Sequence, residues 1–363
     1  MSTEMRRKFK DLGLSCDTVT TVKFSKAMEH VKKPKYVKAP PDFSKIPIQR
    51  ADVYVVAMPK SLSDIKNLAK MGRGARDVEI KIAPHPFASG SCRMAFHAKM
   101  KCHGKWKSYI VKQFLNPRRR EEKNYRAQLE NTAVAMYLGD EWNKTPRGRR
   151  DKPIHFVEES MLRVYDTRTG AFVCYNIEKT IDGKFDKWTN NAGYADTTQP
   201  TLLEFAKWTY EKTRKYCMVT DIQGSISSDE FKLTDPAILC KDTSRFGITN
   251  HGTDVMEICL FAARNALKVV SGDMTAEDVA SSIKKMLSKT PLYKPRALPD
   301  RRTVVRESPP PRREVRRTPR IPHPAMMMGH PAMMMGPRPM FVRPPFGPFG
   351  GPFGGPFGFG RPF

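Results

Sequence analysis

Two acidic residues, Asp221 and Asp235, stand at the ends of short apolar segments, where their types and spacing suit chemistry. Asp221 follows the β-prone run at 217–220, and Asp235 lies between Thr234 and Pro236. Carboxylates at strand ends face a cleft, and such a pair could hold a divalent metal through hard oxygen ligands while one acid acts as base. The same residues also fit a strand that ends in a turn, followed by an ordinary Asp-Pro turn.

Two basic residues upstream help to decide between a metal-binding site and an ordinary turn. Lys112 lies in the strand-like run YIVKQF, so it is either an outward residue of an edge strand or an ammonium that grips phosphate in a cleft. Arg93 follows a turn of small residues that contains Gly90. Small residues let a backbone approach phosphates, which Arg93 would then clamp. With one glycine, the turn fits an ordinary hairpin equally well.

Hydrophobic periodicity and turn signals indicate the elements that must position these residues. Strands are expected at 53–57, 78–83, 96–102, 106–114, 154–157, 161–174 (folded back at a turn over 166–170) and 217–220. Helices are expected at 61–71, 126–142, 201–213, 253–269 and 275–288, the last beginning at a capping box. This mixture predicts an α+β fold.

Composition divides the chain into a basic arm (1–48), a globular domain (49–288) and a tail (289–363). In the arm, apolar residues between 22 and 31 fit a basic amphipathic helix of the kind that binds calmodulin or membranes, or else a solvated lead-in segment. The tail has twelve arginines against three acids, two HPAMMMG units and repeated GPFG, which predicts disorder. Its arginine and phenylalanine suit RNA binding or self-association, and also a simple spacer.

The whole chain has 363 residues and a net charge of +27, which implies attraction to nucleic acid, phosphates or another acidic partner. It has no apolar run long enough to span a membrane, and we expect no signal peptide because no apolar segment follows the basic residues at its start. Its seven cysteines are scattered without a C-x-x-C motif, which indicates free thiols in a reducing compartment. We therefore expect a cytoplasmic protein, with the nucleus as the alternative.

Seven motifs in order extend these observations from single residues to a pattern. They are IKIAPHPFASGSCRMAF, YIVKQF, YNIEKTIDGKFDKW, FAKWTYEKT, VTDIQG, LTDP and FGITNHGTDVM. Together, over residues 78–270, the pattern resembles the atypical alpha-kinase family, in particular its elongation factor 2 kinase and myosin heavy-chain kinase branch. The resemblance implies a two-lobed, protein-kinase-like domain that transfers the γ-phosphate of Mg-ATP to serine or threonine of a protein substrate.

The resemblance also implies roles for individual residues. Asp221 matches the catalytic aspartate, and Gln223 and Asp235 match the residues that hold magnesium. The residues implied to bind ATP are Lys112 on the α- and β-phosphates, Arg93 and Gly90 in the phosphate loop, Glu178 at the adenine-side connector, and Asn250 and Gly252 in the glycine-rich loop. Glu130, on the following helix, is the expected carboxylate partner of Lys112.

The chain departs from the family pattern in two places. The loop 247–255 lacks two of the family's glycines. The positions of the family's structural zinc ligands hold Lys207, Ala262, Arg264 and Lys268, none of which ligates zinc, so we expect no zinc. These departures leave a nucleotide-binding pseudokinase or scaffold as an alternative to an active kinase, and the basic arms leave a second alternative, an RNA-associated protein.

Overall fold

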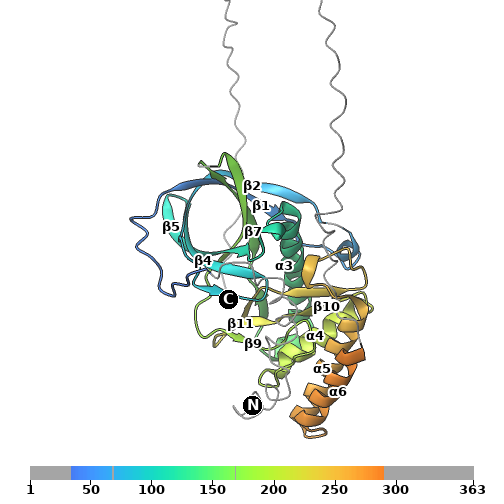
Figure 1. Cartoon of the computed structure of the whole chain (residues 1–363). Helices are drawn as coiled ribbons and strands as arrows, with labels where there is room; N and C mark the ends of the chain where they lie inside the picture. The colour runs from blue at the N-terminus through green and yellow to red at the C-terminus, as the bar shows by residue number, and fades with distance from the viewer. Residues whose placement is uncertain (1–33, 68, 168, 290–363) are drawn as a thin grey trace, which may run out of the picture. The chain divides into compact units, whose positions relative to one another are not determined.

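A seven-stranded sheet forms the N-terminal part of the computed structural model, which describes residues 34–67, 69–167 and 169–289. Its strands are β1 (Gln49–Val56), β2 (Met71–Ile82), β3 (Ala88–Ser89), β4 (Arg93–Cys102), β5 (Lys105–Phe114), β7 (Glu159–Asp166) and β8 (Ala171–Lys179). Their order is β2-β1-β7-β8-β5-β4-β3, and β2 also pairs with β4. The second pairing closes the sheet into the barrel seen in Figure 1.

Alternation along the strands fills the barrel and leaves charged residues outside it. The interior contains apolar side chains from six of the strands: Ala51, Val53, Ile80, Ala98, Val111, Leu162, Val164 and Ile177. Because Val111 points inward, its neighbours Ile110 and Lys112 point outward, and Lys112 lies opposite Ala95 of β4. The run YIVKQF is thus an interior strand of the sheet, and its lysine belongs to the outer face.

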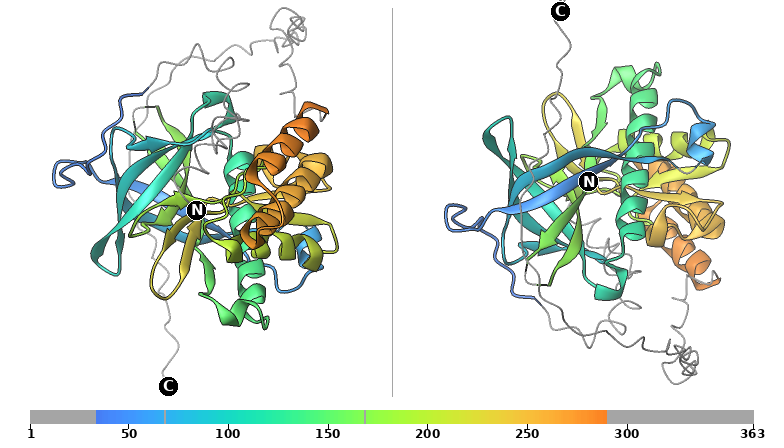
Figure 2. Two further views of the ribbon diagram at one scale, coloured as in Figure 1. Left: turned by 90° about the horizontal axis from the view of Figure 1, so that it is seen from below. Right: turned by 90° about the horizontal axis from the view of Figure 1, so that it is seen from above.

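The C-terminal half combines two small sheets with helices. The sheets are β6 (Ile154–Phe156), β12 (Phe231–Thr234), β11 (Gln223–Ile226) and β9 (Asp186–Lys187) in that order, and the pair β10 (Cys217–Thr220) and β13 (Ala237–Cys240). The helices are α3 (Glu122–Asn143), α4 (Pro200–Lys212), α5 (Gly252–Ser271) and α6 (Ala276–Lys289). Figure 2 shows α5 and α6 on the side of this half that faces away from the barrel.

Helix α3 connects the two halves. Near its start, Tyr125 and Leu129 pack with Phe114 and Met161 of the barrel. Farther along, Val134, Leu138 and Trp142 belong to the core of the C-terminal half. Helix α3 thus contributes to the cores of both halves. It therefore holds in place the strands of both halves that border the space between them.

The α+β fold and the two-part domain are confirmed, and most predicted elements occur within a few residues of their expected positions. The helix expected at 61–71 is wrong. This stretch contains only a short 3-10 turn, η1 (Asp64–Lys66), and from Met71 the chain already runs as β2 beside β1. There Asp64 accepts hydrogen bonds from the backbone of Lys60 and Ser61, which closes a turn instead of starting a helix. The strand expected at 78–83 is the end of this longer strand.

Several predictions concern residues outside the described ranges. The amphipathic helix over 22–31 and the low-complexity tail lie there, and the boundaries at 48 and 288 stay predictions. The six cysteines in the described ranges are free thiols. Among the described helices, none is both long enough and apolar enough to cross a membrane.

Candidate functional site

A cavity of about 1030 Å³ opens between the outer face of the barrel and the loops of the C-terminal half; we call it the cleft. Strands β4 and β5, the connector after β8 and the ends of β10 and β12 contribute to its lining. Seven residues singled out from the sequence line the cleft: Gly90, Arg93, Lys112, Glu178, Asp221, Gln223 and Asp235. The sequence therefore pointed to residues that folding brings to one place.

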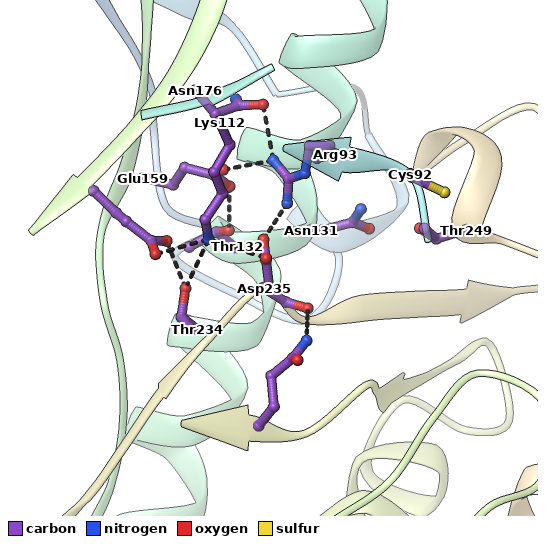
Figure 3. A network of polar contacts seen from close by, with 12 residues as sticks. Cys92, Arg93, Lys112, Asn131, Thr132, Glu159, Asn176, Thr234, Asp235 and Thr249 are labelled. Atoms are coloured by element: carbon purple, nitrogen blue, oxygen red, sulfur yellow. Dashed lines mark hydrogen bonds and ion pairs between the residues drawn. The ribbon is translucent and has the colours of Figure 1, made fainter. Parts of the chain in front are cut away.

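Asp235 lies at the centre of a buried charge network (Figure 3). The Nζ of Lys112 lies 3.0 Å from Oδ2 of Asp235 and 2.7 Å from Oε1 of Glu178. Arg93 pairs with Oδ1 of Asp235 through NH2, and its NH1 donates to Glu159 at 2.9 Å. Both cations thus reach the carboxylate that follows β12.

The network has three carboxylates for two cations, and this imbalance shows in the pKa values. For Asp235, burial favours the neutral acid, but the attraction of Arg93 and Lys112 outweighs it and lowers the pKa to about 2. For Glu178, burial together with the nearby carboxylates raises the pKa, although Lys112 opposes the shift. Burial also opposes the charged form of Lys112, but Asp235 and Glu178 outweigh it and raise the pKa of the ammonium, which stays protonated at neutral pH.

Glu159 belongs to this network but was not predicted. It opens β7, its side chain is 2% exposed, and it accepts a hydrogen bond from Oγ1 of Thr132 at 2.9 Å in addition to its pair with Arg93. Asn176 accepts a further bond from Arg93 at 2.9 Å. These partners fix the guanidinium against the barrel. No local signal marked it, because the same strand also contains Arg163 and Asp166.

Backbone conformation turns both aspartates toward the cleft. Asp221 and Asp235 each have φ of 56°, in the left-handed region that aspartate adopts more readily than most residues. Asp221 directly follows β10, and Asp235 lies between β12 and β13. The strand-end position inferred from the sequence is thus correct, and a local change of backbone direction accompanies it.

The loop around β9 holds Asp221 in place. Lys187 of β9 lies 3.0 Å from Oδ1 of Asp221. The next residue, Ile222, is anchored on both sides, because Thr189 accepts from its backbone nitrogen at 2.9 Å and Trp188 donates to its carbonyl at 2.9 Å. Lys187 was not singled out from the sequence, where it appears as one of several charged residues in a loop.

Gln223 lies beside Asp235 as predicted. It pairs with Thr234 across the β11–β12 ladder, and its Nε2 donates to the backbone carbonyl of Asp235 at 3.2 Å. The next residue must be glycine: a Cβ on Gly224 would overlap with the carbonyl oxygen of Lys232 on β12. This close approach of two backbones sets the spacing of the two side chains at the cleft.

Three residues of the predicted site lie elsewhere. Glu130 does not pair with Lys112; its carboxylate lies 3.8 Å from both Arg126 and Arg245. The carboxylate partner of Lys112 is instead Glu178, on the strand next to β5. The structure does not bring Asn250 or Gly252 to the lining of the cleft, because the side chain of Asn250 is occupied by backbone groups of its own loop.

At the positions where the family pattern places zinc ligands, the side chains of this chain make charged and apolar contacts. Arg264 and Lys207 approach the same oxygen of Glu211, at 3.5 and 4.0 Å. Ala262 is buried against α6 and its neighbours. Within the described ranges, the side chains able to gather around a metal are Glu159, Glu178 and Asp235, which already face Arg93 and Lys112. The absence of zinc stays a prediction.

Comparisons with known proteins show what this chain is similar to in sequence. The alpha-kinase family model matches residues 88–263. Alpha-protein kinase vwkA of Dictyostelium discoideum is 33% identical over 180 residues, which are 48% of this chain and 28% of that protein. Eukaryotic elongation factor 2 kinase of Homo sapiens is 28% identical over 197 residues, 51% of this chain and 25% of the kinase. The chain thus spans about a quarter of the length of these relatives.

Among solved structures, an alpha kinase from Entamoeba histolytica superposes with a TM-score of 0.48 at 21% identity, over 63% of this chain and 88% of that one. The barrel and the C-terminal half form two lobes that helix α3 connects, with the cleft between the lobes. The family match over residues 88–263 takes in just under half of the chain, and this stretch is similar to the alpha-kinase family.

Proposed function

We propose that this chain is a protein kinase that transfers the γ-phosphate of ATP to serine or threonine of a protein substrate. The observation that carries the proposal is the meeting of Arg93, Lys112, Asp221 and Asp235 in one cleft. They come from β4, β5 and the ends of β10 and β12, so four separate segments must agree to place them. Phosphoryl transfer needs this combination of cations and acids more than it needs covalent chemistry.

The two cations suit the phosphates of a nucleotide. Arg93 and Lys112 are almost buried, with side chains 10% and 8% exposed, and both now pair with Asp235. Phosphate oxygens offer them equivalent charge-assisted hydrogen bonds. We infer that a bound triphosphate takes over these bonds and that Glu159 and Glu178 keep the two side chains in position.

The exchange would leave Asp235 available for a cation. Its carboxylate and the side-chain oxygen of Gln223 are hard donors of the kind that magnesium prefers, and the low pKa of Asp235 keeps it ionised at neutral pH. Magnesium bound here would supply neutralisation of the charge on the transferred phosphate. We propose Asp235 and Gln223 as the residues that hold it.

Asp221 is the proposed catalytic residue, because, unlike Glu178 and Asp235, it is a strand-end acid of the cleft whose described ion pair is with Lys187 and not with Arg93 or Lys112. Its carboxylate would accept a hydrogen bond from the substrate hydroxyl and take the proton as the oxygen attacks phosphorus. Lys187, 3.0 Å away, orients the carboxylate toward the cleft.

A transfer assay tests this function. The purified chain is incubated with ATP labelled in the γ-phosphate, magnesium and a basic protein substrate, and the labelled product is hydrolysed to identify the acceptor amino acid. We expect label on serine or threonine, in the substrate or in the chain itself. ATP binding without transfer would contradict the proposal and favour a nucleotide-binding scaffold.

A further inference from the structure

Residues 36–43, which precede the barrel, lie along its outer surface; we call them the strap. Two hydrogen bonds tie its first part to the segment that leads into β4. The backbone nitrogen of Val37 donates to the carbonyl of Pro86 at 2.9 Å, and the hydroxyl of Tyr36 donates to Oγ of Ser89 at 2.9 Å. The strap is therefore attached to the hairpin that carries Gly90.

The rest of the strap is attached to β4 and β2. The carbonyl of Lys38 lies 3.0 Å from Nε2 of His97, and the ammonium of Lys81 donates to the carbonyl of Phe43 at 2.6 Å. The ring of Phe43 is covered by the ammonium of Lys99, whose Nζ lies 5.3 Å from the ring centroid. Backbone and side-chain contacts thus fix the strap at both ends.

The strap forms part of the wall of the cleft. Three of its residues, Pro40, Pro41 and Phe43, belong to the lining. All three side chains are apolar, and the two prolines also have a restricted backbone φ. They belong to the same lining as Phe185 of the connector. A wall of this composition suits a flat aromatic ligand group more than a phosphate.

Register places the Phe43 end of the strap away from the phosphate-binding residues, whereas its Tyr36 end lies at the hairpin that carries Gly90. On β5, Lys112 lies opposite Ala95, whereas Ser108 lies opposite Lys99. At about 3.3 Å per residue, the four steps from Lys112 to Ser108 span roughly 13 Å. Because the strap contacts Lys99, a nucleotide with its phosphates at Lys112 would extend its base toward the strap.

We propose that the strap recognises the base of the nucleotide through Pro40, Pro41 and Phe43 and so completes the ATP site. The inference rests on the proposed function, since it takes the ligand to be ATP. The strap lies outside the family match at 88–263, so the chain's own N-terminal arm supplies this part of the site. The arm is thus more than a linker to the catalytic domain.

A strap that forms a wall of the ATP site leaves room for the nucleotide in the cleft, whereas a strap that acts as an inhibitory plug fills the cleft. With the strap in place the cleft measures about 1030 Å³. Small-molecule sites commonly measure about 300–1,000 Å³, so the remaining space is ample for a nucleotide. The strap bounds the cleft without filling it, and its removal should weaken ATP binding, whereas removal of a plug would strengthen it.

The test uses the full-length chain with Phe43→Ala, and with the double change of Pro40 and Pro41 to alanine. Isothermal titration measures binding of ATP and of inorganic tripolyphosphate, which has the phosphates but no base. We expect each variant to bind ATP about threefold to tenfold more weakly, as loss of an aromatic or stacking contact predicts. Affinity for tripolyphosphate should remain that of the wild type.

Lys144→Ala is the control, because Lys144 makes no described contact with the strap, has a 68% exposed side chain and does not line the cleft. It should bind both ligands like the wild type, and thermal unfolding should show that all variants are folded. Wild-type ATP affinity in the Phe43 and proline variants, or tighter binding, would overturn the inference alone. Failure of the wild type to bind ATP would overturn the proposed function and this inference with it.

Discussion

Lys112 belongs to the barrel sheet and Asp235 directly follows β12 of another sheet, yet Nζ of the lysine lies 3.0 Å from Oδ2 of the aspartate. The contact joins the outer face of the barrel to the end of β12, across the cleft. It also joins Lys112, which we propose to bind phosphate, to Asp235, which we propose to bind magnesium. Binding of Mg-ATP would therefore replace the ion pair between Lys112 and Asp235 with one pair between Lys112 and phosphate and another between Asp235 and magnesium. The role of each residue can therefore be tested by substitution.

Replacement of Lys112 tests the phosphate-binding role. Lys112→Ala removes a preorganised charge from the proposed site, and we expect the transfer rate to fall by roughly 10²–10³-fold. Initial-rate measurements with labelled ATP check this. A change at an exposed lysine outside the cleft, Lys144→Ala, is the control and should leave the rate unchanged. Transfer by Lys112→Ala at the control rate would contradict the assignment.

The low pKa of Asp235 predicts a specific dependence of stability on pH. Because its pKa falls from 3.8 to about 2 on folding, its contribution to the free energy of unfolding is present above the ordinary value and is lost as pH falls through the lowered one. The contribution amounts to about 2 kcal/mol. We expect the stability gap between the wild type and Asp235→Asn, measured by urea unfolding, to narrow from about pH 5 to about pH 3. A gap that stays constant would show that Asp235 does not titrate in this way.

Loss of Glu159 should destabilise the fold. Glu159→Gln removes the buried partner of Arg93, and breaking a buried ion pair costs about 3–5 kcal/mol. Because Arg93 keeps Asp235 as a partner, we expect the lower end of this range in the free energy of unfolding. The control is Glu204→Gln, which breaks the exposed pair with Arg147 and should cost at most about 1 kcal/mol. Equal costs for the two variants would contradict the structural role of Glu159.

The expected absence of zinc can be measured directly. Lys207 and Arg264 approach Glu211 where the family pattern places metal ligands, and neither side chain binds zinc. We expect elemental analysis of the purified chain to find well below one zinc per molecule. A strong zinc chelator should leave its melting temperature unchanged. Stoichiometric zinc, or unfolding on chelation, would show that other residues hold the metal.

Much of the site could be predicted from the sequence, because its acids follow strands and its cations stand out among apolar neighbours. Asp221 and Asp235 follow strand-like runs near one another in the chain, so local signals drew attention to them, whereas the role of Gln223 was inferred only from the family resemblance. Lys112 stood out as the charge in an apolar strand. In each case a charged side chain lies next to apolar residues that are expected to be buried, and a functional site explains why it is there.

The rest depended on contacts between distant segments. Glu159 meets Arg93 only because β7 and β4 belong to one closed sheet, which no local pattern reveals. Glu130 was misplaced because a shift of two residues on a helix turns a side chain by about 200°. Gln128, two residues earlier, is the member of α3 that lines the cleft. The strand that begins at Met71 likewise follows from pairing with β1, which outweighs local helix signals.

The most direct test of the account compares the wild type with Asp221→Asn, a change that keeps the size of the side chain and removes its charge. Both proteins are assayed for transfer of the γ-phosphate with magnesium, and for ATP binding by titration. We predict that the variant binds ATP like the wild type while its transfer rate falls by roughly 10²–10⁴-fold, as loss of a catalytic base requires. Transfer by Asp221→Asn at a rate near that of the wild type would contradict the central claim.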